Sequence, residues 1–515
     1  MKIATKKWLI SFGLFLMITC SLGLPFRKMN FFWDSYGDFL HTMQAKQRGS
    51  FFKTIFIDDV TVEENCAADN QAHGVDRSKP LTLFGFMYRP LIYFYRLIQI
   101  NLFGVNPYIF FLLHILLHAC NVVMLFLLLA TLLPLAPSTL LACFFAYNHS
   151  WWSLLRWIAV QFYFIEALCI LFFIWCLYKT LTTNRFIWGV PAAFCLFHNL
   201  LLKEQSLALV PWLGMVFLAE HMLVYKHAFI DWDWIKRCFL FSWPSLIALG
   251  AWVLTRWLIL QNALQAWPIN TSTSTVDIAS ASGVGSAMLR WLINLPNILV
   301  DLVGLDWFPP FHKLEKMLTL VLLVSFFIWL LSFVKPPAWL LFFTISYLLF
   351  AWPTYTLRHY HPRYVYMAMP LFIGLIALAL KILHETNWRQ YRFAFAGLTL
   401  ISMLNAGFLV KRMCVSERET DLVAQSFKTL VAENPTIFER TMCFYGLPPE
   451  LFDACVAQAM TWLAPHFQRR TIYYFKYEKT IAACKLDAAF LATDPLFITW
   501  DSARQKMVIV AQEAA

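Results

Sequence analysis

Residues 108–132 read YIFFLLHILLHACNVVMLFLLLATL and contain no Asp, Glu, Lys or Arg. An apolar helix of about 20 residues is long enough to cross the hydrocarbon core of a bilayer. The stretch therefore predicts a transmembrane helix. The whole chain shares this character, since 60% of its 515 residues are hydrophobic and only 14% are charged. Such a composition excludes a water-soluble fold and predicts that lipid surrounds most of the chain.

Further apolar runs lie on both sides of this stretch. The first, from Trp8 to Pro25, follows a lysine-containing N-terminus and is either a cleaved signal peptide or a retained span. The others lie at 138–150, 157–178, 186–201, 206–224, 238–259, 317–334, 337–353, 364–382 and 393–411. Together with 108–132 they predict about eleven transmembrane helices.

The loop charges predict how these helices are oriented. Short loops rich in Lys and Arg face the cytoplasm, and 179–185, 225–237 and 381–392 are of this kind. The N-terminus is then inside, while the loop 26–106 and the C-terminus are outside. We interpret the net charge of +11 as topology plus attraction to anionic membrane lipids. No basic tract is present, so nucleic acid is not an expected partner.

The character of the chain changes after the last span. We divide it into a membrane domain, 1–412, and an extracytoplasmic α/β domain, 413–515. The second domain is predicted from a helical pattern at 417–433, an amphipathic segment at 451–463, strands at 441–445 and 471–475, and a hairpin at 497–510 with its turn at 502–505. Cys443 and Cys455 can form a disulfide if the compartment is oxidising. The expected fold class is an all-α polytopic membrane protein with this small domain attached.

The first outer loop carries an acid among aromatic residues, in the sequence FFWDSYGD at 31–38. A carboxylate shielded by aromatic side chains can serve as a general base, so Asp34 is the candidate catalytic base. The alternative is a loop acid that caps an interfacial helix. Further along, Asp58-Asp59 and Glu63-Glu64 form an acidic cluster that can bind a divalent cation or can be solvated loop charge.

Basic residues suited to an anionic ligand occur at three places. Arg89, in YRPL at 88–91, can bind a phosphate or extend to lipid head groups. Lys203-Glu204 interrupts an apolar stretch, and charge inside a bilayer is costly, so the pair belongs at a turn or in a polar cavity. Arg358 and Arg363 lie in RHYHPRY at 358–364 and can bind a phosphate. The alternative is that this stretch is a belt of basic residues at the membrane interface. All these residues and Asp34 fall on the outer side under one topology, where a base and several cations can serve an anionic lipid donor.

Five stretches, taken in order, resemble the C-type (GT-C) glycosyltransferases that use polyprenyl-phosphate sugars. The closest likeness is to the membrane part of the tetratricopeptide-type protein O-mannosyltransferases and their bacterial relatives. The stretches are WDSYG at 33–37 with YRPL at 88–91, FGVNP at 103–107 with LHACN at 117–121, FA at 145–146 with WI at 157–158, KE at 203–204 with Pro211, and RYVY at 363–366 before Pro370. The likeness covers roughly residues 25–372.

The resemblance implies an inverting sugar transfer on the outer face of the membrane. Asp34 would take the proton of the acceptor hydroxyl, which attacks the anomeric carbon. The cations Arg89, Lys203, Arg358 and Arg363 would neutralise the leaving lipid phosphate. Glu204 would orient Lys203, and His118 and Asn121 would line or brace the cavity.

The chain also departs from this family. Ser35 replaces the second acid of the first loop, so the second acid is Asp38, Asp58 or Asp59, and use of a divalent cation stays open. Asn148-His149 and two Trp replace the polar residues that usually follow Phe-Ala. No tetratricopeptide repeats follow the last span, which favours a bacterial plasma (inner) membrane over the endoplasmic reticulum. The acceptor is a protein, a glycolipid or a polysaccharide.

Two functions of other classes compete with the transferase. A transporter or lipid flippase also places charges inside the membrane, but inverted repeats, which would favour it, are not found in the sequence. A non-catalytic membrane assembly subunit is the other alternative, since Ser35 is consistent with a degenerate site.

Overall fold

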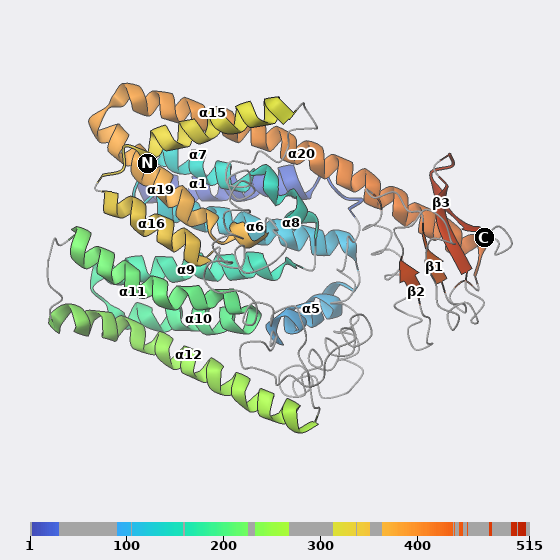
Figure 1. Ribbon diagram of the computed structural model, residues 1–515, viewed down its shortest axis with the longest axis horizontal. Helices are drawn as coiled ribbons and strands as arrows, with labels where there is room; N and C mark the ends of the chain where they lie inside the picture. The colour runs from blue at the N-terminus through green and yellow to red at the C-terminus, as the bar shows by residue number, and fades with distance from the viewer. Residues whose placement is uncertain are drawn as a thin grey trace.

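The computed structural model describes residues 3–29, 90–104, 106–157, 160–224, 232–266, 313–335, 337–350, 363–435, 437, 442–445, 451, 473–475, 496–501 and 503–510. Figure 1 shows a bundle of helices that lie side by side, with a small sheet beyond one end of the bundle and the N-terminus near the other. A single long helix, α20 (Trp388–Glu433), connects the bundle to the sheet.

The described part of the chain consists mostly of helices. They are α1 (Ile3–Ile18), η1 (Thr19–Gly23), α5 (Pro90–Phe103), α6 (Pro107–Leu129), α7 (Leu135–Ala146), η2 (His149–Trp151), α8 (Trp152–Arg156), α9 (Phe162–Thr183), η4 (Phe186–Trp188), α10 (Gly189–Leu202), η5 (Glu204–Ala208), α11 (Leu209–Ala219), η6 (Glu220–Val224), α12 (Trp232–Ala266), α15 (Lys313–Leu331), α16 (Pro337–Phe350), α18 (Arg363–Tyr366), α19 (Met369–Thr386) and α20.

Every predicted span overlaps one of these helices. Within the described ranges, six helices are long and apolar enough to cross a membrane, and four more apolar helices are shorter. The chain is thus a multi-pass membrane protein, as its composition predicted. These numbers do not confirm the predicted count of about eleven spans.

Local sequence explains where several helices begin and end. The Asn106 side chain accepts hydrogen bonds from the backbone N–H of Tyr108 at 3.1 Å and of Ile109 at 3.4 Å, and Pro107 occupies the first helical position of α6. Asn387 caps α20 in the same way through Gln390 N–H, at 3.1 Å. At the end of α9, Asn184 adopts a left-handed conformation with φ of 52°.

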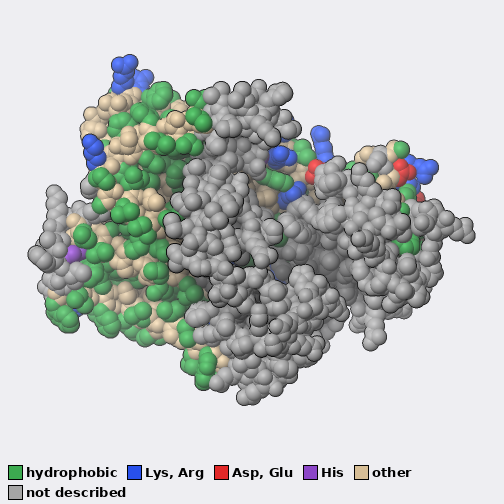
Figure 2. Space-filling model, viewed as in Figure 1, with side chains coloured by type: hydrophobic (Ala, Val, Ile, Leu, Met, Phe, Trp, Pro, Cys, Tyr) green, Lys and Arg blue, Asp and Glu red, His purple; other side chains and the backbone are tan. Residues whose placement is uncertain are grey.

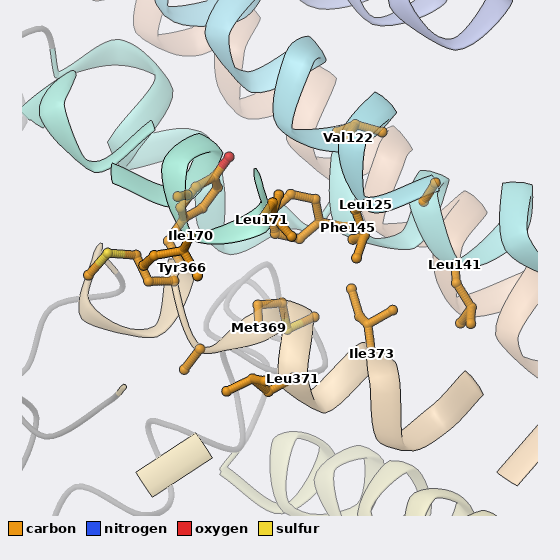
Figure 3. Packing of buried hydrophobic residues seen from close by; sticks show 14 of the residues in the cluster. Val122, Leu125, Leu141, Phe145, Ile170, Leu171, Tyr366, Met369, Leu371 and Ile373 are labelled. Atoms are coloured by element: carbon orange, nitrogen blue, oxygen red, sulfur yellow. The ribbon is translucent and has the colours of Figure 1, made fainter. Parts of the chain in front are cut away.

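The core of the bundle lies between α1, α6, α7, α9, α10 and α19. Figure 3 shows buried side chains, among them Leu125, Phe145, Leu171 and Ile373, that point toward one another from α6, α7, α9 and α19. Because lipid tails are as apolar as these side chains, close packing rather than a hydrophobic driving force holds such helices together.

The C-terminal sheet has four strands in the order β2-β1-β3-β4. The strands are β1 (Met442–Phe444), β2 (Tyr473–Phe475), β3 (Leu496–Asp501) and β4 (Lys506–Val510). Strand β1 runs parallel to both β2 and β3, with Cys443 opposite Tyr474 and Phe497, and β3 pairs antiparallel with β4. The predicted strands and hairpin are therefore confirmed, whereas Cys455 and most of the predicted 451–463 segment lie outside the described residues.

Helix α20 continues through the position of the predicted domain boundary at 412 and reaches the sheet. There the Ser426 hydroxyl accepts a hydrogen bond from Met507 N–H at 2.6 Å, and Lys506 pairs with Glu433 at 3.6 Å. In the hairpin, the Asp501 carboxylate accepts from Ala503 N–H at 2.9 Å and Arg504 N–H at 3.1 Å. An Asp that binds its own turn in this way is a common turn former, which explains the turn predicted at 502–505.

The close packing of α10 on α12 predicts that a larger residue at Gly189 lowers the stability of the protein. A Cβ atom at Gly189 would lie 2.7 Å from the Phe241 carbonyl oxygen, so Gly189→Ala forces these helices apart. We expect a loss of about 1–3 kcal/mol of stability, the usual cost of overpacking. The measurement is the fraction of monodisperse detergent-solubilised protein after heating. Gly250→Ala on α12 is the control, because a Cβ there meets nothing within 4 Å; equal stability of both variants would contradict this packing.

Candidate active site

The structure describes part of the residue set predicted for the site. His118, Asn121 and Lys203 are described with their side chains, and Glu204 and Arg363 are described by their place in η5 and α18. The predicted acids Asp34, Asp38, Asp58 and Asp59 and the predicted phosphate-binding residues Arg89 and Arg358 lie outside the described residues.

A buried hydrogen-bond network centres on the Tyr366 hydroxyl. His118 Nδ1 lies 2.7 Å from this oxygen, and Asn121 Nδ2 donates to it at 3.2 Å. His118 Nε2 lies 2.9 Å from the Ala146 carbonyl, which can only accept, so Nε2 carries the hydrogen. Nδ1 then accepts the hydroxyl hydrogen of Tyr366. All three side chains are completely buried.

This network joins three of the stretches that carry the family resemblance. LHACN at 117–121 supplies His118 and Asn121, FA at 145–146 supplies the Ala146 carbonyl, and RYVY at 363–366 supplies Tyr366. The Phe145 ring packs against Tyr366 with the ring centroids 5.2 Å apart. Segments almost 250 residues apart in sequence therefore meet at one point. That His118 and Asn121 line or brace a donor cavity stays a prediction.

Lys203 lies between the end of α10 and the start of η5. Helix α10 ends at Leu202, Lys203 is extended, and η5 begins at Glu204, so the predicted turn is present. The Lys203 ammonium donates a hydrogen bond to the Tyr163 hydroxyl. It also lies 3.9 Å from the centroid of the Tyr163 ring and 5.6 Å from that of Phe162. Lys203 is 7% exposed, so aromatic faces surround a buried cation.

Glu166 is a buried acid that we did not predict. It is the only charged residue of the predicted span 157–178 and is completely buried. Its carboxylate accepts a hydrogen bond from the Ser206 hydroxyl, and its backbone carbonyl accepts from Asn199 Nδ2 at 3.0 Å. Asn199 precedes Lys203 and Ser206 follows it, so α9 holds the chain on both sides of the lysine. A lone carboxylate in a membrane span is itself a signal of function, and that signal was available in the sequence.

Arg96 of α5 is a second buried cation, 2% exposed, that we did not predict. Its guanidinium donates to Gln161 Oε1 at 3.1 Å and to Gln99 Oε1 at 3.2 Å. Gln161 directly precedes the two aromatic residues that surround Lys203. The sequence predicted a phosphate-binding cation at Arg89, in the outer loop. Arg96 lies seven residues later, on the helix α5 that begins directly after Arg89.

An apolar cavity of about 310 Å³ lies along the C-terminal halves of α6 and α9. Its lining comes from α6, α9, α11, α16 and α19, and includes Leu125, Leu171, Trp212 and Leu371. Leu125 lies one helical turn beyond Asn121 on the same face of α6. The cavity therefore begins one helical turn from Asn121 and extends away from the polar network, to Thr131, Tyr178 and Glu220.

The described residues contain no group of three or more His, Cys, Asp or Glu side chains that could hold a metal ion. The predicted acidic cluster at 58–64 lies outside them, so a divalent cation stays a prediction.

Comparison with known proteins identifies the fold. No family model and no curated protein matches the chain. Among solved structures it is similar to the crystal structure of ArnT from Cupriavidus metallidurans in the apo state, with a TM-score of 0.51 and 12% identity. The likeness covers 98% of this chain and 94% of that one. ArnT is a C-type glycosyltransferase, so the resemblance drawn from the motifs is confirmed at the level of the fold.

The hydrogen bonds of the Tyr366 hydroxyl predict that its removal lowers the stability of the protein. Tyr366→Phe removes the hydroxyl and leaves His118 Nδ1 without a partner, while Asn121 keeps its bond to the Phe164 carbonyl at 2.9 Å. We expect a loss of about 1–3 kcal/mol, the cost of an unsatisfied buried polar group. Thermal unfolding of the purified protein is the measurement. Tyr391→Phe is the control, since the Tyr391 hydroxyl makes no hydrogen bond within the described ranges; equal melting of both variants would contradict the network.

Proposed function

We propose that the chain is an inverting glycosyltransferase that moves a sugar from a polyprenyl-phosphate donor to an acceptor hydroxyl at the outer face of the membrane. The observation that carries this proposal is the buried lysine Lys203, held by aromatic rings in a C-type fold whose helices α6 and α9 also line an apolar cavity. A polyprenyl-phosphate sugar has the same two parts, an anionic phosphate and a long apolar chain.

The phosphate is the leaving group, and it needs cations rather than a general acid. As the acceptor oxygen bonds to the anomeric carbon, the bond from that carbon to the phosphate oxygen breaks, and negative charge gathers on the lipid phosphate. A preorganised cation in a site without water stabilises that charge strongly. We assign this role to Lys203, together with Arg89, Arg358 and Arg363, and add Arg96 because it is buried beside the same end of α9.

Glu166 is assigned a positioning role. Through Ser206 and Asn199 it fixes the extended segment that carries Lys203. From the sequence alone, Glu204 was expected to orient this lysine. Asp34 remains the proposed base that takes the acceptor proton. Asp38, Asp58 and Asp59 remain the candidates for a second acid, and a divalent cation at that acid is part of the proposal.

The structural neighbour supports the donor class and the location. ArnT uses a polyprenyl-phosphate-linked sugar, and its fold favours a transferase over a transporter or an assembly subunit. Its source, Cupriavidus metallidurans, supports the proposed bacterial inner membrane over the endoplasmic reticulum. Membrane lipids are expected partners, and the acceptor is a protein, glycolipid or polysaccharide.

Removal of the charge on Lys203 tests whether this lysine stabilises the donor phosphate as it leaves. For Lys203→Gln we expect kcat to fall about 10²- to 10³-fold, as when one donor is lost from an oxyanion site. The assay follows sugar transfer by the full chain in nanodiscs with a panel of synthetic polyprenyl-phosphate sugars. Lys179→Gln is the matched control, because Lys179 lies 4.8 Å from the Trp175 ring at the other end of α9. Equal rates for both variants would refute the assignment.

Replacement of the acids tests the base. Asp34→Asn keeps the shape of the side chain but cannot accept the acceptor proton, so turnover should fall about 10²-fold or more. Binding of the donor should stay near normal, because Asp34 does not contact the phosphate in this mechanism. Asp38→Asn and the double Asp58→Asn, Asp59→Asn variant are assayed beside it. If Asp34→Asn transfers sugar normally while the double variant is inactive, the base lies in the later acidic pair.

A further inference from the structure

Gln205, two residues after Lys203, is a buried amide with one end in use and the other end free. The side chain is 1% exposed, and its Nε2 donates a hydrogen bond to the Phe350 carbonyl at 2.5 Å. A carbonyl can only accept a hydrogen bond, so this contact fixes which end of the amide is the nitrogen. The other end, Gln205 Oε1, has no hydrogen-bond partner among the described residues.

A structural role explains the nitrogen of this amide but not its oxygen. Phe350 is the last residue of α16, and the carbonyls at the end of a helix lack partners within the helix. The Gln205 nitrogen therefore caps α16, a task for which a donor alone is enough. A buried acceptor without a partner is costly and rare in native proteins, and it calls for an explanation such as a bound ligand or water.

The surroundings restrict where a partner for this oxygen can come from. Figure 2 shows hydrophobic side chains over much of the described surface of the helical bundle, as expected for a surface that faces lipid. Lipid tails offer no hydrogen-bond donors. A donor for the buried oxygen of Gln205 therefore has to enter the interior of the bundle.

Gln205 lies next to both parts of the proposed donor site. The segment η5 that follows Lys203 is hydrogen-bonded to α9 through Ser206 and to α16 through Gln205. Trp212 follows Gln205 by seven residues, which is about two helical turns, so both lie on one face of this helical segment. Trp212 lines the apolar cavity, and its ring packs on Phe350 with the centroids 5.9 Å apart. Along the chain, Gln205 thus stands between Lys203 and a wall of the cavity.

We propose that Gln205 Oε1 accepts a hydrogen bond from a hydroxyl group of the sugar in the lipid-linked donor, and thereby selects which sugar is transferred. The inference rests on the proposed function, in which Lys203 holds the phosphate to which that sugar is bonded. A hydroxyl donates readily to an amide oxygen, whereas the carboxylate of an acidic sugar has no hydrogen to donate and is repelled. The substrate class is therefore a neutral sugar with a free hydroxyl at the position that faces Gln205.

Deoxygenated donors test this contact. The full chain in nanodiscs is assayed with polyprenyl-phosphate glucose, mannose and galactose, and then with every monodeoxy form of the sugar that is transferred best. For wild-type protein we expect one monodeoxy form to lower kcat/KM about 10- to 100-fold, because the buried oxygen then stays unpaired. Gln205→Met keeps the length of the side chain but removes the oxygen. In this variant the parent sugar and that monodeoxy form should have the same kcat/KM, because both changes remove one interaction.

Ser346→Ala is the matched control. The Ser346 hydroxyl accepts a hydrogen bond from Trp212 Nε1 at 3.0 Å, so this change also removes a bond between α16 and the segment that contains Gln205. We expect Ser346→Ala to keep the wild-type preference for the parent sugar. If it abolishes the preference as Gln205→Met does, Gln205 acts only by holding α16 and the proposal is overturned.

Binding of polyprenyl phosphate without a sugar separates this proposal from the proposed function. Native mass spectrometry should show that Gln205→Met binds it like wild-type protein, whereas Lys203→Gln binds it more weakly. If wild-type protein transfers every monodeoxy form as well as the parent sugar, or if Gln205→Met keeps the wild-type preference, water satisfies the oxygen. The sugar contact is then overturned while the proposed function stands. Wild-type protein that neither binds polyprenyl phosphate nor transfers sugar would overturn both.

Discussion

Polar side chains inside an apolar bundle have to hydrogen-bond to one another, because lipid offers them no partners. In this protein that constraint fixes the relative positions of four helices. The Tyr366 hydroxyl ties α18 to α6 through His118, and Asn121 ties α6 to α9 through the Phe164 carbonyl. Two residues further along α9, Glu166 holds the segment that carries Lys203. The first two turns of α9 therefore hold the other parts of the site in place through these hydrogen bonds.

The same arrangement separates two environments that a lipid-linked substrate requires. Buried cations and a carboxylate lie near the start of α9, and a cavity lined mainly by apolar side chains lies along the second half of this helix. Charge placed in a region of low dielectric acts strongly on a developing negative charge, so Lys203 suits a departing phosphate better than an exposed lysine would. The apolar cavity at the same time favours a substrate with a hydrocarbon chain over a soluble sugar phosphate.

Much of the fold was predictable from local sequence. Runs such as 108–132 require a bilayer, and the Asn-Pro pair at 106–107 marks the start of α6, so helix positions followed from composition and caps. The strands at 442–444 and 473–475 followed from short β-branched or aromatic patterns. The site was less predictable, because the contacts of Tyr366 with His118 and Asn121 depend on packing between distant helices. Glu166 stands out in the sequence as a lone acid in a span, whereas only the packing of α5 shows that Arg96 is buried.

The central claim is that the buried end of this bundle holds the phosphate of a lipid-linked sugar donor. The most direct measurement is a cryo-electron microscopy structure of the full chain in nanodiscs with a polyprenyl phosphate added. We expect density for the phosphate in contact with the Lys203 ammonium, and density for the chain entering the cavity between Leu125, Leu171 and Leu371. A phosphate bound elsewhere, with Lys203 still hydrogen-bonded to Tyr163 and the cavity without a chain, would contradict the claim.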